Sequence, residues 1–250
     1  MGTDRAGATT PDADARIADL PARLAVVRAR VAAAATAADR SPQDVRILLA
    51  SKTMPVEVVR AAVVAGADLL GENRVQELVA KAPALADLGP AVHVIGPLQS
   101  NKVNAALAWA ACVQSVDTLD LARRLSSRCV ATDRDLEVMV QVNVSGEPTK
   151  HGVAPADAVA LATAVAALPR LRLTGLMTVG ARSHDVALVR SGYRLLRELR
   201  DAVAGSGAPG TAGAIELSMG MSGDIEAAVA EGSTLLRIGS AAFGPRAPLA

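Results

Sequence analysis

The feature that most constrains the fold is a regular alternation of short apolar runs with longer amphipathic segments. Helix signals stand at the start of several amphipathic segments: Pro55, Asp117, Pro155 and Ser222. Strands that alternate with helices predict a parallel sheet, because two parallel strands need a crossover connection. The eight apolar runs expected as strands are Ile47–Ala50, Leu69–Gly71, Val92–Ile95, Cys112–Val116, Val138–Val142, Leu173–Met177, Ile215–Leu217 and Leu235–Ile238.

Eight strand–helix units fit a closed (β/α)8 barrel of the TIM type better than an open doubly wound sheet, which has about five or six strands. A helix is expected over Arg16–Ala38, ahead of the first strand, and the small polar residues 1–14 are predicted to form a loose tail. The glycine-rich linker Gly205–Gly213 is too short to separate two domains. We therefore expect a single α/β barrel domain over residues 15–250.

Composition and charge exclude several classes of partner. The 26 Lys and Arg residues almost cancel the 25 Asp and Glu residues, so the net charge of +1 supplies no basic field for nucleic acid. With one Trp, one Tyr and one Phe, the chain can build neither a base-stacking surface nor an aromatic belt at a membrane. No apolar stretch is long enough to span a bilayer, and Cys112 and Cys129 follow no signal peptide. We expect a cytoplasmic protein without a nucleic-acid or membrane partner.

Lys52 is the strongest candidate for chemistry. It directly follows the first predicted strand, and side chains at the carboxyl ends of barrel strands form the ligand sites of this fold. Partial burial at such a position lowers the pKa of an amine and frees the lone pair that attacks a carbonyl carbon. On this segment alone two interpretations stay open: a lysine that forms a Schiff base, and a strand-end lysine that only reaches solvent.

Two segments near the end of the chain predict a phosphate site. Ser218-Met219-Gly220-Met221-Ser222-Gly223-Asp224 follows the seventh strand, and the eighth strand ends in Arg237-Ile238-Gly239-Ser240. Glycine lets backbone amides approach an anion, serine adds a hydroxyl donor, and barrels often bind phosphate between these two loops. The alternative is that both segments are ordinary strand-to-helix turns.

Arg237 lies within an apolar strand, so its guanidinium needs an acceptor. That acceptor is either a carboxylate such as Glu216, or a ring nitrogen or acid group of a ligand. An amine after the first strand, a phosphate site after the last two and an arginine between them describe a pocket for a phosphorylated aldehyde. Pyridoxal 5'-phosphate (PLP) is the obvious candidate.

Several motifs occur in one order along the chain: Ala50-Ser51-Lys52-Thr53, Gly71-Glu72-Asn73, Val75-Gln76-Glu77, His93-Val94-Ile95-Gly96-Pro97-Leu98-Gln99-Ser100-Asn101-Lys102, Leu217-Ser218-Met219-Gly220-Met221-Ser222 with Asp224, and Arg237-Ile238-Gly239-Ser240-Ala241. With these motifs the sequence resembles the family of pyridoxal phosphate homeostasis proteins over nearly the whole chain from about residue 16. Relatives often carry an aromatic residue at the position of Arg74 and threonine at the position of Ser240, so the chain departs from the family pattern there. The resemblance implies a single barrel like the N-terminal domain of alanine racemase, with PLP held as an aldimine on Lys52.

The same resemblance implies a set of cofactor-binding residues and no catalytic ones. Ser218, Gly239 and Ser240 would hold the phosphate, Asn73 would line the pocket, and Arg237 would face the pyridine nitrogen. An arginine donates a hydrogen bond to that nitrogen without protonating it, which makes the ring a weaker electron sink. The complete implied set is Lys52, Asn73, Ser218, Met219, Arg237, Gly239 and Ser240.

The role implied by the resemblance is to bind, store or hand over PLP without turnover. Alanine racemase takes its opposing acid or base from a tyrosine in a second domain. The only tyrosine here, Tyr193, falls in a predicted helix between strands six and seven, and the sequence ends at Ala250. We therefore expect a monomer without racemase activity that delivers PLP transiently to apo-enzymes. The alternatives are a PLP-dependent racemase or decarboxylase of small amino acids, and a cofactor-free Schiff-base aldolase.

The remaining polar residues carry weaker signals. Lys102 and Lys150 occupy loop positions, where each is either a second amine for the aldehyde or a solvated lysine. His93 either lines the pocket or is a hydrogen-bonded core histidine. Because His93, His151 and His184 lie far apart and lack metal-ligand spacing with the cysteines, we expect no metal site.

Overall fold

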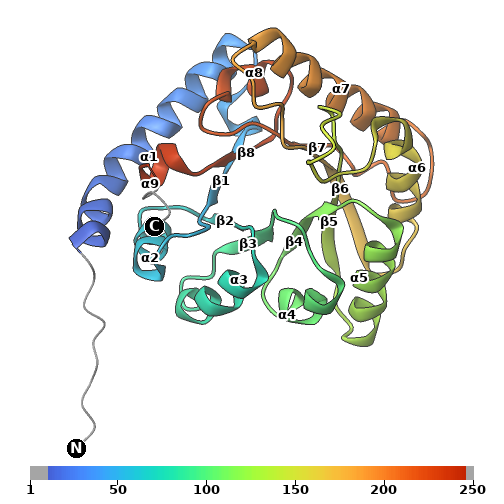
Figure 1. Ribbon diagram of the computed structural model, residues 1–250, viewed down its shortest axis with the longest axis horizontal. Coiled ribbons are helices and arrows are strands. Elements are labelled where there is room, and N and C mark those ends of the chain that lie inside the picture. Colours follow the sequence, from blue (N-terminus) through green and yellow to red (C-terminus); the bar gives the residue numbers. More distant parts are fainter. Residues whose placement is uncertain (1–10, 246–250) are drawn as a thin grey trace, which may run out of the picture.

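The computed structural model describes residues 11–245 and shows a closed barrel of parallel strands (Figure 1). Each strand pairs with its neighbour along the chain, and β8 closes the ring by pairing with β1, where Arg237 lies opposite Leu48. The predicted (β/α)8 barrel is thereby confirmed. The strands are β1 (Arg46–Ala50), β2 (Leu69–Glu72), β3 (Ala91–Val94), β4 (Cys112–Val116), β5 (Leu136–Gln141), β6 (Leu171–Met177), β7 (Glu216–Ser218) and β8 (Leu235–Ile238).

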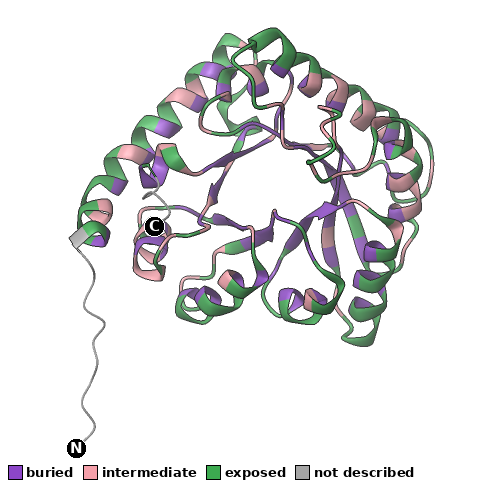
Figure 2. Cartoon of the chain, in the orientation of Figure 1, coloured by how far each residue is buried: buried purple, intermediate pink, exposed green. Residues whose placement is uncertain are grey.

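Helices surround the barrel, with their buried residues facing the strands and their exposed residues facing outward (Figure 2). This is the arrangement expected for amphipathic helices on a sheet that is buried on both faces. Within residues 11–245, no helix is long and apolar enough to cross a membrane. The helices are α1 (Pro11–Ala37), α2 (Val56–Val64), α3 (Val75–Lys81), α4 (Val103–Leu107), α5 (Leu119–Ala131), α6 (Pro155–Ala166), α7 (Val186–Ala204), α8 (Ile225–Ala230) and α9 (Ser240–Phe243), with 3-10 turns at Pro42–Asp44, Ala82–Leu85 and Ser100–Lys102.

Helix α1 begins earlier than the sequence suggested. It starts at Pro11, so residues 11–14, predicted as part of the tail, are helical, whereas residues 1–10 of that tail lie outside the described residues. Asp12 and Asp14 in the first turn favour this start, because negative charge stabilises a helix amino end. The helix packs on α2, α8 and α9, and Arg30 pairs with Glu226 at 2.6 Å. It therefore closes the outer ring between the first and last strand–helix units.

Two of the predicted helix starts shift by one or two residues. Thr118, not Asp117, caps α5, because its hydroxyl accepts a hydrogen bond from the Leu121 amide at 3.3 Å. Asp224, not Ser222, holds the cap position of α8. Pro155 begins α6 as predicted, and Pro55 precedes α2 as its cap residue. Because Ser222 does not cap α8, its side chain is available to the site described below.

A polar column runs through the barrel interior between two apolar clusters. Arg237 donates from Nη1 to Ser218 Oγ at 2.8 Å, and Ser218 donates to Gln114 Oε1 at 2.6 Å. The Gln114 amide Nε2 lies 2.7 Å from Nδ1 of His93. Each contact satisfies a buried polar group with another, so the interior can hold these side chains without water. The flanking clusters are Leu48, Leu69, Leu235 and Ile95 on one side, and Cys112, Met139, Met177 and Val179 on the other.

Candidate functional site

A cavity of about 350 Å³ lies at the carboxyl end of the barrel. Its wall brings together five of the predicted site residues, although they come from strands at opposite ends of the sequence. The cavity volume lies within the range of small-molecule sites, roughly 300–1,000 Å³. The lining residues are Ala50, Lys52, Asn73, Ile95, Val179, Met221, Ser222, Gly223, Arg237, Gly239 and Ser240.

Side chains of α3 form hydrogen bonds with the turn that carries Lys52. Thr53 adopts a left-handed φ of 64°, which is uncommon for a residue other than glycine. Its amide donates to Glu77 Oε2 at 2.6 Å, and Lys81 Nζ donates to the Ser51 carbonyl at 2.8 Å. The residues on both sides of Lys52 are therefore fixed, which aims a half-buried lysine at the cavity.

Beneath this turn lies a buried ion pair between Lys81 and Glu72. Lys81 Nζ is 2.9 Å from Glu72 Oε1, which also accepts a hydrogen bond from Ser51 Oγ at 2.8 Å. Burial raises the pKa of Glu72, and the hydrogen bond from Lys81 opposes that rise. The other oxygen, Oε2, is buried without a hydrogen-bond partner in the described part of the chain and borders a void of about 10 Å³. Such a void is close to the size of one water molecule.

The sequence assigned no role to Glu72 and Glu77, which stand in the quoted motifs, or to Lys81, which is one of the four lysines of the chain. The signal was present: Lys81 stands four residues after Glu77, which is the spacing of a pair on one helix face. What the spacing could not reveal is that Ser51 and Thr53, on a different strand end, receive these side chains.

Arg237 reaches the cavity from within β8 and is 5% exposed. Its Nη1 donates to Ser218 and its Nη2 donates to the Thr178 carbonyl at 2.6 Å. The ion pair with Glu216 considered above is not formed, because Glu216 pairs with Arg46 at 2.5 Å near the other end of the barrel. Burial lowers the pKa of Arg237, with Tyr193 and Asp224 opposing the effect. A guanidinium held by neutral acceptors keeps its charge available to a ligand.

The two loops predicted to bind phosphate meet in the structure. Ser222, on the loop after β7, accepts a hydrogen bond from the Ala241 amide in the first turn after β8 at 3.2 Å. Ser222 and Gly223 line the cavity together with Gly239 and Ser240. A side chain on Gly239 would meet no atom closer than 3.7 Å, so packing alone does not require glycine there. The open space beside its backbone faces the cavity.

Ser218 and Met219, which were predicted to bind the cofactor, do not line the cavity. Both are fully buried: Ser218 is engaged by Arg237 and Gln114, and Met219 packs in the main apolar core. Gly220 adopts a φ of 93° and turns the chain after them, which brings Met221, Ser222 and Gly223 to the cavity wall in their place. Ser218 thus positions Arg237 by accepting a hydrogen bond from its guanidinium.

Asn73 follows β2 and lines the cavity, and the chain after β3 passes very close to its backbone. A side chain on Gly96 would lie 2.3 Å from the Asn73 carbonyl oxygen, so only glycine allows this approach. Arg74, which departs from the family pattern, is exposed at the cap position of α3. Its side chain does not line the cavity.

Several other residues considered from sequence lie outside the cavity wall. Lys102 ends a 3-10 turn, and Lys150 donates to Glu147 at 2.6 Å and to the Gly180 carbonyl at 3.0 Å. Tyr193 lies in α7, as predicted, fully buried, and donates to Asp224 at 2.7 Å. Burial raises the pKa of Tyr193, and the charge of Asp224 adds to that rise. His93 is a hydrogen-bonded core histidine that lines a separate cavity at the amino end.

With the geometry established, comparison with known proteins fixes the family. The model of the alanine racemase N-terminal domain matches residues 23–247. Pyridoxal phosphate homeostasis protein of Pseudomonas aeruginosa is 46% identical over 223 residues, which covers 89% of this chain and 94% of the relative. This chain belongs to the pyridoxal phosphate homeostasis protein family. The Escherichia coli K12 member of the family is 42% identical over 232 residues, covering 91% of this chain and 97% of its own.

Solved structures agree with this family assignment. PipY of Synechococcus elongatus, solved with PLP bound, is 32% identical with a TM-score of 0.75, and the match covers 90% of this chain and all of PipY. A Bifidobacterium adolescentis protein of unknown function is 40% identical with a TM-score of 0.89, covering 96% of this chain and 100% of its own. Alanine racemase of Corynebacterium glutamicum, at 18% identity and a TM-score of 0.64, shares the fold. The barrel of this homeostasis protein family is thus the alanine racemase type, as the sequence predicted.

Proposed function

We propose that the chain binds PLP in the carboxyl-end cavity, with the Lys52 amine bonding the aldehyde as a Schiff base, and that it holds the cofactor without turnover. The observation that carries the proposal is the shared wall: Lys52, Arg237 and the Gly239-Ser240 turn border one cavity of about 350 Å³. The family relatives are named for PLP homeostasis, and the PipY structure contains PLP. PLP supplies an aldehyde for the covalent bond and a phosphate for non-covalent binding.

The residues present fit the chemical groups of PLP. An amine is needed for the aldehyde, and Lys52 is the lysine among the described residues of the cavity wall. Backbone amides and hydroxyls suit a phosphate, and the wall offers Ser222, Gly223, Gly239 and Ser240 from two converging loops. Arg237, held by Ser218 and Thr178, is the donor available to the pyridine nitrogen. Asn73 completes the wall next to Lys52.

The absence of turnover is proposed from the side chains that line the cavity. Amino-acid racemisation needs a proton donor or acceptor on each face of the substrate carbon. Among the described lining residues, Lys52 and Arg237 are the only ones with a titratable side chain, and a guanidinium stays protonated. Tyr193 is fully buried, and its hydroxyl donates to Asp224 outside the cavity wall. One amine without an opposing acid or base supports a cofactor-holding role and argues against a racemase.

The visible absorption spectrum of the purified protein with PLP tests the proposal. We expect the wild type to show a Schiff-base band, and Lys52→Ala to lose it while the far-UV circular dichroism stays unchanged. Lys102→Ala and Lys150→Ala are matched controls, because neither lysine lines the cavity. Borohydride reduction and peptide mapping should then place the added pyridoxyl mass on the peptide that contains Lys52. A band that survives in Lys52→Ala would disprove the assignment.

Turnover is tested separately with a panel of D- and L-amino acids in deuterated water. We expect no racemisation and no decarboxylation, with deuterium exchange at the α carbon no faster than with free PLP. Efficient exchange would make the chain a PLP-dependent enzyme. If the protein shows no bound chromophore, and borohydride reduction fixes a carbonyl substrate covalently on it, the chain would instead be a cofactor-free aldolase.

A further inference from the structure

A second group of reactive side chains lies in the amino-end half of the barrel, far along the polar column from the PLP cavity. Here β3, β4 and β5 run side by side, and their register places His93 opposite Cys112 and Cys112 opposite Glu137. Residues paired in this way on parallel strands point to the same face of the sheet, about 4.8 Å apart. One ligand atom from each of the three side chains lies within 4.8 Å of those of the other two.

We propose that His93, Cys112 and Glu137 form a binding site for a thiophilic divalent cation such as Zn²⁺. An imidazole nitrogen, a thiolate and a carboxylate oxygen are the three ligand types that zinc takes from proteins. The sequence suggested no metal site because these residues stand 19 and 25 positions apart in the chain. Strand register, which sequence spacing does not show, is what brings them together.

The histidine is oriented for a ligand. His93 is 4% exposed, and its Nδ1 is taken by Gln114. Its Nε2 has no hydrogen-bond partner in the described part of the chain, and the residue borders the cavity of about 420 Å³ at the amino end. A second residue that fixes the ring through its other nitrogen is the usual support of a metal-binding histidine. When Nε2 binds the metal, Nδ1 carries the proton. Gln114 accepts a hydrogen bond from that N–H after rotation of its amide, which turns its Nε2 toward Ser218 Oγ and replaces the hydrogen bond that Ser218 donates to Oε1.

The thiol forms no disulfide, and the carboxylate is held by a solvent-exposed arginine. Cys112 is 1% exposed. Burial raises the pKa of the Cys112 thiol, so the sulfur–metal bond has to offset the loss of the thiol proton. Binding exchanges its S–H proton, which leaves to solvent, for a sulfur–metal bond. Glu137 hydrogen-bonds with Arg172, whose side chain is 67% exposed, so the arginine can turn to water when the carboxylate binds the cation. An ion pair as exposed as this one contributes little to stability.

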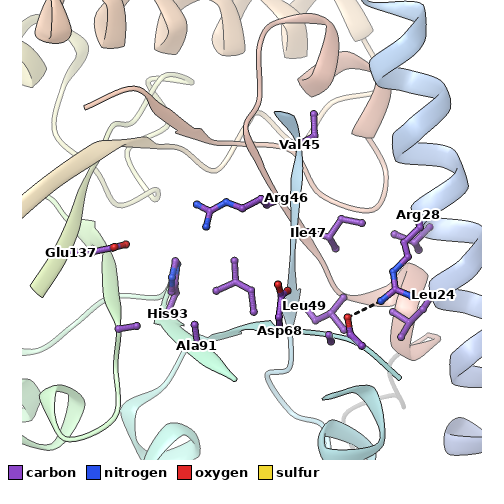
Figure 3. A pocket seen from close by; sticks show the side chains of 15 residues that line it. Leu24, Arg28, Val45, Arg46, Ile47, Leu49, Asp68, Ala91, His93 and Glu137 are labelled. Atoms are coloured by element: carbon purple, nitrogen blue, oxygen red, sulfur yellow. Dashed lines mark hydrogen bonds between the residues drawn. The ribbon is translucent and has the colours of Figure 1, made fainter. Parts of the chain in front are cut away.

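The charges around the cluster are mixed, and the site borders a cavity. Burial lowers the pKa of His93 to about 4, and the positive charge of Arg46 adds to that effect. The two arginines near the cluster, Arg46 and Arg172, are each paired with a glutamate, Glu216 and Glu137. Figure 3 shows His93, Glu137 and Arg46 directed toward the same space, and the cavity wall there includes Ala91 and Ala111. Three protein ligands and an open fourth position toward a cavity match the pattern of a zinc site that also holds water or a small anion.

Titration with Co²⁺, a spectroscopic substitute for zinc, tests this site. We expect one equivalent per chain to bind and to give a thiolate-to-cobalt charge-transfer band that Zn²⁺ abolishes in competition. Cys112→Ser should lose the band, whereas Cys129→Ser, the matched control at the other free cysteine, on α5, should keep it. Glu137→Gln should weaken Co²⁺ binding at least about ten-fold, as should loss of the imidazole in His93→Gln.

The outcomes distinguish a metal site from the alternative, in which His93 is a buried histidine with a packing role only. Failure of the wild type to give a thiolate band, or an identical band in Cys112→Ser and the wild type, would overturn the site. If Cys112→Ser does not fold by circular dichroism, Glu137→Gln decides, because its half-exposed side chain can be replaced without disturbing the core. Lys52→Ala should bind Co²⁺ like the wild type. The metal site and the PLP site can therefore fail independently.

Discussion

The two ends of the barrel satisfy their charged groups in different ways. At the amino end, Arg46 pairs with Glu216 and Arg172 pairs with Glu137. Arg46 and Glu137 line a cavity of about 420 Å³ there (Figure 3). At the carboxyl end, Arg237 is held by a hydroxyl and a carbonyl, and no carboxylate lies within ion-pair distance of it among residues 11–245. The end with the larger cavity thus pairs Arg46 and Arg172 with carboxylates, although Arg28, which also lines that cavity, donates to the carbonyls of Ala65 and Gly66. The end with the smaller one presents a cation held by neutral groups.

This difference shows that cavity size does not identify the functional end of such a barrel. In parallel barrels the long strand-to-helix loops follow the carboxyl ends, so converging ligand groups gather there whatever the volume. A buried cation held only by neutral acceptors costs stability, and such a cost is typical of sites prepared for an anionic or electron-rich ligand. The predictions below test whether the contrast between the two ends is real.

The largest effect is expected at the buried pair beneath the carboxyl end. Lys81→Met should leave Glu72, 3% exposed, without its cation and lower the free energy of unfolding by about 3 kcal/mol at pH 7. The value lies at the low end for a broken buried pair, because protonation of Glu72 relieves part of the penalty. Chemical denaturation measures it. PLP retention should fall as well, since Lys81 also holds the Ser51 carbonyl next to Lys52.

The double variant Lys81→Met with Glu72→Gln is the control for this prediction. Removing both charges should restore more than half of the lost stability, because no uncompensated charge stays buried. If the double variant is as unstable as Lys81→Met alone, lost packing explains the result, and the ion pair does not have the role assigned here.

Arg237→Met should separate stability from cofactor binding. Methionine removes a buried charge at similar volume, and it also leaves the Thr178 carbonyl and the Ser218 hydroxyl without the hydrogen bonds from Arg237. The two effects oppose each other, so the free energy of unfolding of the PLP-free protein should stay within about 1 kcal/mol of the wild type. The affinity for PLP should fall about ten-fold or more, which is the scale of one lost hydrogen bond from a charged group. Thermal denaturation and a fluorescence titration with PLP measure the two quantities. Lower stability together with unchanged affinity would make Arg237 a structural residue.

The fold was largely predictable because strand and helix signals alternate along the chain. Every predicted strand overlaps an observed one, and Cys112–Val116 and Leu235–Ile238 match the observed bounds. The first helix was less predictable. Its Pro11–Asp14 turn has a composition typical of a tail and is helical where it continues α1, which packs against α2, α8 and α9. Such packing between distant segments leaves no local trace in the sequence.

The site was predictable only in part. The residues that the sequence revealed differ physically from those that it did not reveal. Lys52 and Gly239 could be found because a residue at a strand end is visible in the sequence. The place of Ser218 behind the cavity wall could not be read from the sequence. The orientation of the last strand residue decides whether its hydroxyl faces the cavity or the barrel interior, and a one-residue shift reverses it. Gln114 was missed because its partners, His93 and Ser218, come from strands that meet only in the closed barrel.

A smaller effect is expected at Glu77, which holds the Thr53 amide. Although burial opposes it, hydrogen bonds from Thr53 and Lys81 hold the pKa of Glu77 below its ordinary value. A lowered carboxyl pKa contributes stability that is present above the unfolded value, about 4.3, and is lost as the pH falls below it. Glu77→Gln should therefore cost about 1 kcal/mol at pH 7, and the difference from the wild type should shrink toward zero on acidification. A difference that is constant between neutral and acidic pH would contradict the assigned charge.

The smallest effect is expected at the amino end, where Arg46→Gln removes one partner of Glu216. The Arg46 side chain is 52% exposed, so the pair with Glu216 should contribute only about 0–1 kcal/mol to the free energy of unfolding. PLP affinity should not change, because Arg46 lines the other cavity. Arg237→Met, by contrast, should weaken PLP binding. If Arg46→Gln weakened PLP binding as much as Arg237→Met does, the polar column would connect the two ends energetically, and the ends could no longer be treated as independent sites.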